Sequence, residues 1–162
     1  MKKNKTFSLT QAAMIAALYV VLTYASNALG LASGNIQIRL SEALTILPAF
    51  TPSGIGGLFI GCLLSNILTG CCLIDIIFGS LATLLGAVGT RLLRKKKGLM
   101  YLPPILSNAF IVPFVLKYGY GLDLPIPLMI ATVGIGEIIS CGLLGSFLSR
   151  ALKKNKHIFK EV

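Results

Sequence analysis

Two oppositely charged residues, Arg39 and Glu42, stand about one helical turn apart in the segment IQIRLSEAL. The chain around them is almost uncharged, because no Asp, Glu, Lys or Arg occurs at positions 6–38 or 43–74. An arginine donates hydrogen bonds to carbonyl and carboxylate oxygens, and a glutamate accepts them from N–H groups. The pair therefore has two interpretations. It forms a local ion pair at a helix start capped by Ser41, or its side chains line a polar pocket.

A further carboxylate, Glu137, lies within a long apolar run, in the segment GIGEIISCG. A charge at the centre of a membrane helix costs roughly 2.5–3.5 kcal/mol, so such residues usually face a cavity, a partner or a substrate. Asp75 and Asn108 add a carboxylate and an amide from other apolar segments. These residues favour a polar ligand site built from several segments. The alternative is a structural carboxylate that pairs with Arg39.

Patterns typical of catalysis do not accompany these residues. The sequence has no phosphate-binding glycine-rich loop, its single histidine is His157 in the basic tail, and no nucleophile stands beside a base. Its cysteines lie in apolar runs without the spacing of a metal site, at Cys62, Cys71, Cys72 and Cys141. We therefore expect a binding protein that is not an enzyme, with small packing cysteines and without a metal or cofactor.

The composition indicates a membrane protein. Of the 162 residues, 55% are hydrophobic and 12% are charged, whereas ordinary soluble domains carry about 25% charged residues. The mean hydropathy is +0.84, and several apolar runs reach the ~20 residues that a membrane-spanning helix needs. The predicted fold class is an all-α membrane protein.

The net charge of +10 is concentrated in short segments beside the apolar runs, at 2–5, 91–97 and 150–160. A nucleic-acid-binding surface would have aromatic residues interleaved with the basic ones, and only Phe159 stands among them. Short Lys- and Arg-rich segments next to membrane helices favour the cytoplasmic side. Both termini and the connection at 91–97 are therefore predicted to be cytoplasmic.

This placement requires an even number of crossings between successive basic segments. Residues 98–149 hold two apolar runs around the turn YGYGLDLPIP. Residues 8–29 hold one, and residues 41–92 hold three when PAFTPSG and LTGCCL are interpreted as turns. We expect one domain over residues 1–162 with six transmembrane helices. Their predicted bounds are 8–29, 41–51, 53–69, 73–92, 99–117 and 126–149.

The predicted topology has an outer side that collects most of the acidic residues. The connections at 30–40, 69–73 and 118–125 face outward, and Glu42 and Asp75 begin spans next to them. The sequence therefore places the expected polar pocket toward the outer face.

Small residues recur every four positions in the first span. Ala12 and Ala16 form one such pair, Ala13 and Ala17 form another, and two glycines repeat the spacing in the segment GGLFIG. Faces of this kind let helices approach closely. From spacing alone, packing within the protein and contact with another subunit are equally supported.

Four segments carry a resemblance to a known family: IQIRLSEALTILPAFTP, GLFIGCLLSNIL, DIIFGSLATLLGA and LPPILSNAFIVP. Over residues 9–150 the chain resembles the QueT family of queuosine-precursor transporters, substrate-binding S components of energy-coupling factor (ECF) transporters. The resemblance implies six helices in the plasma membrane, cytoplasmic termini and an outer substrate pocket. It also implies three partners, a transmembrane coupling subunit and two cytoplasmic ATPases. The residues implied to contact the coupling subunit are Ala12, Ala13, Ala16 and Ala17.

The ligand implied by this resemblance is a 7-deazaguanine such as 7-aminomethyl-7-deazaguanine. One carboxylate would accept hydrogen bonds from the guanine-like N–H groups, and a second would pair with the protonated aminomethyl group. We expect Glu137 or Asp75 at the guanine edge and Glu42 at the amine. The other expected contacts are the donors Gln37, Arg39 and Asn108 and the stacking rings Tyr118 and Tyr120.

Two alternatives remain open from the sequence. The chain is an S component for another small, vitamin-like solute, or it is a structural membrane protein without a transport role, whose buried polar groups only join helices.

Overall fold

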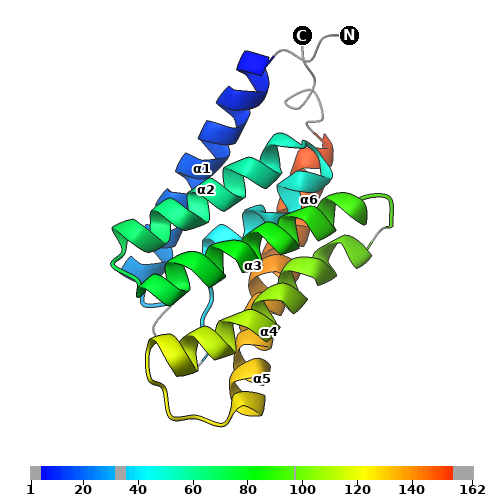
Figure 1. Ribbon diagram of the computed structural model, residues 1–162. Coiled ribbons are helices and arrows are strands. Elements are labelled where there is room, and N and C mark those ends of the chain that lie inside the picture. Colours follow the sequence, from blue (N-terminus) through cyan, green and yellow to red (C-terminus); the bar gives the residue numbers. More distant parts are fainter. Residues whose placement is uncertain (1–4, 32–35, 97, 155–162) are drawn as a thin grey trace.

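The computed structural model describes residues 5–31, 36–96 and 98–154, which form helices joined by short connections (Figure 1). Within these residues the elements join into six continuous helical stretches. In chain order these are α1 (Lys5–Ala28), η1 (Leu40–Ala49), α2 (Ser53–Leu68), α3 (Leu73–Leu92), η2 with α4 (Leu99–Tyr101, Leu102–Gly119), and α5, η3 and α6 (Ile126–Glu137, Ile138–Leu144, Gly145–Lys154). The predicted all-α fold is confirmed. The remaining parts of the predicted basic segments, at 1–4, 97 and 155–162, lie outside the described residues.

The helices begin and end close to the predicted span limits. Four helical stretches of the described chain are long and apolar enough to cross a bilayer, namely Lys5–Ala28, Leu73–Leu92, Leu99–Gly119 and Ile126–Lys154. The helices η1 and α2 are shorter. That η1 and α2 each cross the membrane separately stays a prediction.

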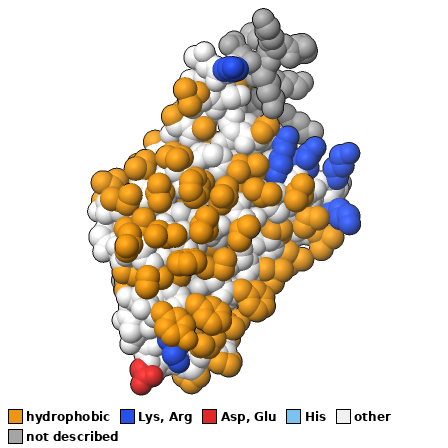
Figure 2. Space-filling model, in the orientation of Figure 1, with side chains coloured by type: hydrophobic (Ala, Val, Ile, Leu, Met, Phe, Trp, Pro, Cys, Tyr) orange, Lys and Arg blue, Asp and Glu red, His pale blue; other side chains and the backbone are white. Residues whose placement is uncertain are grey.

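Large apolar side chains cover the outside of the bundle. Figure 2 shows them over the middle of the molecule, with most Lys and Arg toward the upper end and a basic side chain beside an acidic one at the lower end. Exposed leucines and phenylalanines on this surface include Leu18, Leu85, Phe110 and Phe147. An apolar surface of this extent would be unusual in water, and it matches the hydrocarbon core of a membrane.

The two ends of the bundle differ in charge. At the end that we call the basic end, α3 runs into Arg91, Arg94 and the lysines that follow, and the Arg91 guanidinium donates to the Pro48 carbonyl at 3.1 Å. At the opposite end, which we call the site end, the Tyr24 hydroxyl donates to the Leu68 carbonyl at 3.0 Å. The connections at 69–73 and 118–125 also approach each other at this end, where the Cys72 backbone N–H donates to the Tyr120 hydroxyl at 3.4 Å.

The helix η1 lies at the centre of the bundle and is buried over most of its length. It is a 3₁₀-helix that contains Pro48 and contacts α1, α2, α3 and α6. A 3₁₀-helix rises about 2.0 Å per residue against 1.5 Å in an α-helix, so ten residues extend ~20 Å. Runs of this length are uncommon and often mark functional segments.

The start of η1 differs from the prediction. The helix begins at Leu40, with Arg39 in an extended conformation before it, and no side chain caps it. The predicted cap at Ser41 is wrong. Ser41 lies inside the helix, where its hydroxyl oxygen accepts a hydrogen bond of 3.0 Å from Thr23 of α1.

The two alanine pairs of α1 have different environments. Ala12 and Ala16 face α2: a Cβ on Gly57 would lie 2.7 Å from the Ala12 carbonyl oxygen, and a Cβ on Gly61 would lie 3.0 Å from the Ala16 Cα. Ala13 and Ala17 are exposed on the outside of the bundle. Ala12 and Ala16 therefore pack within the protein, whereas Ala13 and Ala17 remain exposed.

The helices α3 and α4 approach just as closely in the half of the bundle next to the basic end. A Cβ on Gly86 would lie 2.7 Å from the Pro104 Cα, and Gly89 lies against Pro103. Separations this short leave no room for a side chain between the two backbones.

The α1–α2 contact predicts a difference between two glycines of α2. Gly61→Ala places a methyl group 2.7 Å from the Tyr19 Cβ, whereas a Cβ on Gly56 meets nothing within 4 Å. We expect Gly61→Ala to lower the free energy of unfolding in detergent by about 1–3 kcal/mol because of overpacking. The matched control Gly56→Ala should leave it unchanged or raise it, since alanine favours a helix. Equal stability of the two variants would contradict the contact.

Candidate functional site

Two adjoining cavities lie toward the site end of the bundle. The outer cavity has a volume of about 240 Å³ and is lined by residues that include Asp75 and Tyr120. The inner cavity has a volume of about 20 Å³ and is lined by residues that include Glu42 and Glu137. The lining residues common to both cavities are Gln37, Arg39 and Val112.

Glu42 is the most deeply buried of the carboxylates, with 2% of its surface exposed. One of its oxygens accepts a hydrogen bond from the Tyr19 hydroxyl of α1. The other accepts from the Asn108 side-chain amide of α4 at 3.4 Å. Glu42 therefore joins three helical stretches at one point, because η1, α1 and α4 each supply one of these residues.

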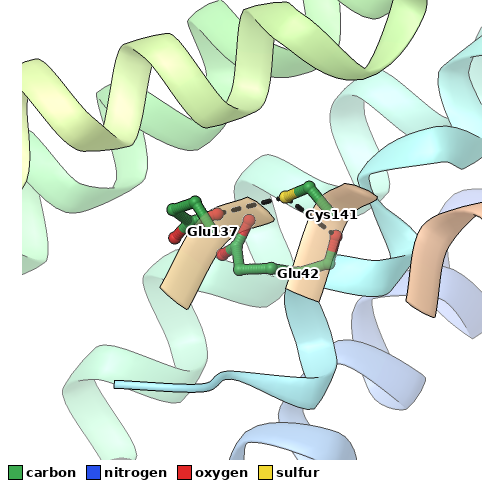
Figure 3. Close-up of side chains that lie close together, drawn as sticks. All are labelled: Glu42, Glu137 and Cys141. Atoms are coloured by element: carbon green, nitrogen blue, oxygen red, sulfur yellow. Dashed lines mark hydrogen bonds between the residues drawn. The ribbon is translucent and has the colours of Figure 1, made fainter. Parts of the chain in front are cut away.

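Glu137 approaches the same point from the last helical stretch. Its Oε2 lies 3.1 Å from the Cys141 thiol, which also lies 3.5 Å from the Glu42 carbonyl oxygen (Figure 3). Side-chain atoms of Glu42, Glu137 and Cys141 lie within 4.8 Å of one another. Glu137 is also the residue from which the helix changes from α to π geometry, and π-helical turns occur frequently at functional sites.

Asp75 lies at the start of α3, in the outer cavity. Its Oδ2 accepts a hydrogen bond of 2.8 Å from the Tyr120 hydroxyl, and its backbone carbonyl accepts one of 3.3 Å from Asn66. Burial raises the pKa of Tyr120, and its neighbours Cys71 and Asp75 raise it further. The phenol of Tyr120 therefore stays protonated at neutral pH and can act as the donor to Asp75.

Arg39 and Gln37 line both cavities. The Arg39 backbone N–H donates to the Ser140 hydroxyl at 3.2 Å, and Gly136 allows the Gln37 backbone to lie directly against α5. Within the described residues, neither side chain takes part in a hydrogen bond or an ion pair. The local ion pair between Arg39 and Glu42 is therefore not formed there, and the guanidinium is available to the cavities.

The site contains more carboxyl groups than cationic groups. Glu42, Asp75 and Glu137 are 2%, 4% and 8% exposed, and Arg39 is the cation that lines the same cavities. None of the three carboxylates forms an ion pair in the part of the chain that the structure describes. Because buried charges in proteins are usually paired, this arrangement is suited to a ligand that brings a cation and N–H donors.

Seven of the eight predicted ligand contacts line the two cavities. The structure brings together Gln37, Arg39, Glu42, Asp75, Asn108 and Glu137. It does not bring Tyr118 to them. That side chain is 69% exposed and stacks on Phe114 on the outside of α4, with ring centroids 6.5 Å apart. The other predicted ring, Tyr120, does line the outer cavity.

Sequence reasoning missed two residues of the site, Tyr19 and Cys141. Tyr19 stands in the apolar first span, and nothing in its surroundings sets it apart from the other tyrosine there, Tyr24. Cys141 was expected to be a packing residue. Its position four residues after Glu137 was the available signal, because residues with this spacing lie on one face of a helix.

Comparison with known proteins gives the family. The model of the family described as QueT transporter matches residues 9–154 of the chain. The chain belongs to the QueT transporter family. A relative, the Queuosine precursor transporter QueT of Lactococcus lactis subsp. cremoris (strain MG1363), is 31% identical over 165 residues, which cover 95% of this chain and 96% of the relative. No solved structure matches the chain.

Membership of the QueT family agrees with the fold and the site. The long apolar helices make this family member a multi-pass membrane protein, and the family gives it a transport role. A buried polar site near one end of the bundle is the arrangement that a solute-binding transport protein needs.

The hydrogen bond from Tyr19 to Glu42 leads to a stability prediction. Tyr19→Phe removes a donor from a carboxylate inside the bundle, which typically costs about 1–3 kcal/mol. Tyr24→Phe is the matched control, since the Tyr24 side chain is 45% exposed and its hydroxyl bonds a carbonyl near the surface. We expect the thermal unfolding temperature, measured in detergent without ligand, to fall clearly for Tyr19→Phe and to change little for Tyr24→Phe. The same shift in both variants would contradict a structural role of this bond.

Proposed function

We propose that the chain is the substrate-binding S component of an ECF-type importer and captures a queuosine precursor at the outer face of the plasma membrane. The ligand proposed is a 7-deazaguanine such as 7-aminomethyl-7-deazaguanine. The observation that carries the proposal is the set of buried carboxylates, Glu42, Asp75 and Glu137, which lie beside Arg39 without an ion pair in the described residues.

The chemistry of such a ligand complements this site. A guanine-like ring offers N–H donors along one edge and a carbonyl acceptor, and the aminomethyl group offers a cation. Carboxylates accept charge-assisted hydrogen bonds from the cation and accept bonds from the ring N–H groups. Arg39, Gln37 and Asn108 supply donors for the carbonyl. The printed name of the relative in Lactococcus lactis supports the same class of substrate.

The proposed orientation follows from the charge of the two ends. The basic end carries Arg91, Arg94 and neighbouring lysines, and such residues favour the cytoplasmic side. The site end then faces outward, so that the outer cavity receives the solute from outside. In this orientation the α1 residue Lys5 also lies on the cytoplasmic side, together with both termini.

The energy for uptake comes, in this proposal, from partners. A transmembrane coupling subunit would contact the exposed alanine face of α1, formed by Ala13 and Ala17, and two cytoplasmic ATPases would drive the cycle. The chain itself would bind the solute without catalysis. Ala12 and Ala16 are occupied by α2, so the proposed contact uses the exposed pair.

A binding titration tests the substrate. We expect 7-aminomethyl-7-deazaguanine to bind the purified full-length chain saturably in calorimetry, with a dissociation constant below about 1 µM, and riboflavin not to bind. Arg39→Gln should weaken binding about tenfold or more, because a charge-assisted hydrogen bond is worth roughly 1.5–3 kcal/mol. The matched control is Arg91→Gln at the basic end, which should bind like the parent. Well-folded parent protein that binds no deazaguanine would refute the proposed substrate.

Co-purification tests the partner face. Ala13→Leu with Ala17→Leu should prevent capture of the coupling subunit, because larger side chains block close helix approach, and should leave ligand affinity unchanged. Ala28→Leu is the matched control, since Ala28 is exposed at the other end of α1. Normal capture by the double variant would place the coupling subunit elsewhere.

A further inference from the structure

The two cavities of the site differ in what they can hold. A single water molecule needs roughly 10–15 Å³ of cavity volume measured at the centre of a water-sized probe. The inner cavity, at about 20 Å³, therefore has room for one group of that size. The outer cavity, at about 240 Å³, is about twelve times larger and approaches the lower limit of ~300 Å³ for small-molecule sites.

The inner cavity has two carboxylates that lie close enough together to share one ammonium group. Side-chain oxygens of Glu42 and Glu137 lie within 4.8 Å of each other. An ammonium group that donates two hydrogen bonds of ~2.8 Å at the tetrahedral angle bridges oxygens ~4.6 Å apart. A bicyclic ring does not fit this cavity, whereas a primary ammonium is close in size to the water molecule that does.

The outer cavity has the features of a ring site. Val112, Val115 and Leu116 of α4 supply apolar surface, and Asp75 supplies a buried carboxylate beside it. Tyr120 already donates to Asp75 Oδ2, which leaves further acceptor capacity on that carboxylate. Apolar walls with a few polar groups are typical of sites for flat heterocycles.

We propose that the site divides its ligand into two parts, with the ring in the outer cavity against Asp75 and a primary ammonium arm in the inner cavity between Glu42 and Glu137. This inference rests on the proposed function and deepens it. Arg39 and Gln37, which line both cavities, lie where the arm leaves the ring and donate to the ring carbonyl. The inner carboxylates thus select the arm, and Asp75 binds the ring whatever arm it carries.

The test compares two ligands on the full-length protein in detergent. Calorimetry would give the affinities of 7-aminomethyl-7-deazaguanine and of 7-deazaguanine, which lacks the arm, and their ratio is the selectivity. In Glu137→Gln we expect the selectivity to fall about 10- to 100-fold, the size of one charge-assisted hydrogen bond, with 7-deazaguanine affinity almost unchanged. In the matched variant Asp75→Asn both affinities should fall by a similar factor and the selectivity should persist.

The opposite pattern would overturn the inference. Loss of selectivity in Asp75→Asn with retention in Glu137→Gln would show that the ligand binds in the reverse orientation. Unchanged selectivity in both variants would show that neither carboxylate contacts the arm. In either case the parent still binds the deazaguanine, so the proposed function stands. If the parent binds neither ligand, it is the proposed function that fails.

A second measurement needs no variant and therefore does not depend on how the variants fold. A ligand with the same ring and a trimethylammonium arm keeps the charge but is too large for a cavity of about 20 Å³. We expect it to bind the parent no more tightly than 7-deazaguanine. Affinity equal to that of the primary amine would refute an ammonium-sized inner cavity.

Discussion

Burial of carboxylates inside an apolar bundle is the constraint on which this structure depends. Glu42 is nearly inaccessible, and its two oxygens are bonded by Tyr19 from α1 and Asn108 from α4. A carboxylate without such donors would carry a large desolvation cost. The positions of α1 and α4 around η1 are therefore linked to the same hydrogen bonds that shape the site, and the small residues of α1 and α2 allow the required approach.

The helices could be predicted from the sequence because their limits are marked by local chemistry. Prolines and glycines mark the connection before α2, the segment LTGCCL separates α2 from α3, and the basic residues follow α3. Because charged residues are rare in the chain, Glu42 and Glu137 could be recognised as candidate site residues. A carboxylate in an apolar segment is costly unless it has a partner or a ligand. What these local signals did not contain was the 3₁₀ geometry of η1.

Contacts between distant segments account for what the sequence could not provide. Tyr19 and Cys141 belong to the site because α1 and the last helical stretch both pack on η1, and neither residue has a charge that would reveal it. Tyr118 and Tyr120 are the same residue type two positions apart, but their side chains lie in different places. Tyr118 is still in α4 and points outward beside Phe114, whereas Tyr120 lies just past the helix and reaches Asp75.

The close backbone contacts of the basic half determine how a bound solute can leave. Gly86 and Gly89 hold α3 against Pro103 and Pro104, and Gly57 and Gly61 hold α2 against α1. A passage through this half would require backbones in van der Waals contact to separate, with loss of the packing that stabilises the bundle. Under the proposed function, these contacts favour delivery by movement of the bundle as a whole over a channel that opens through its middle.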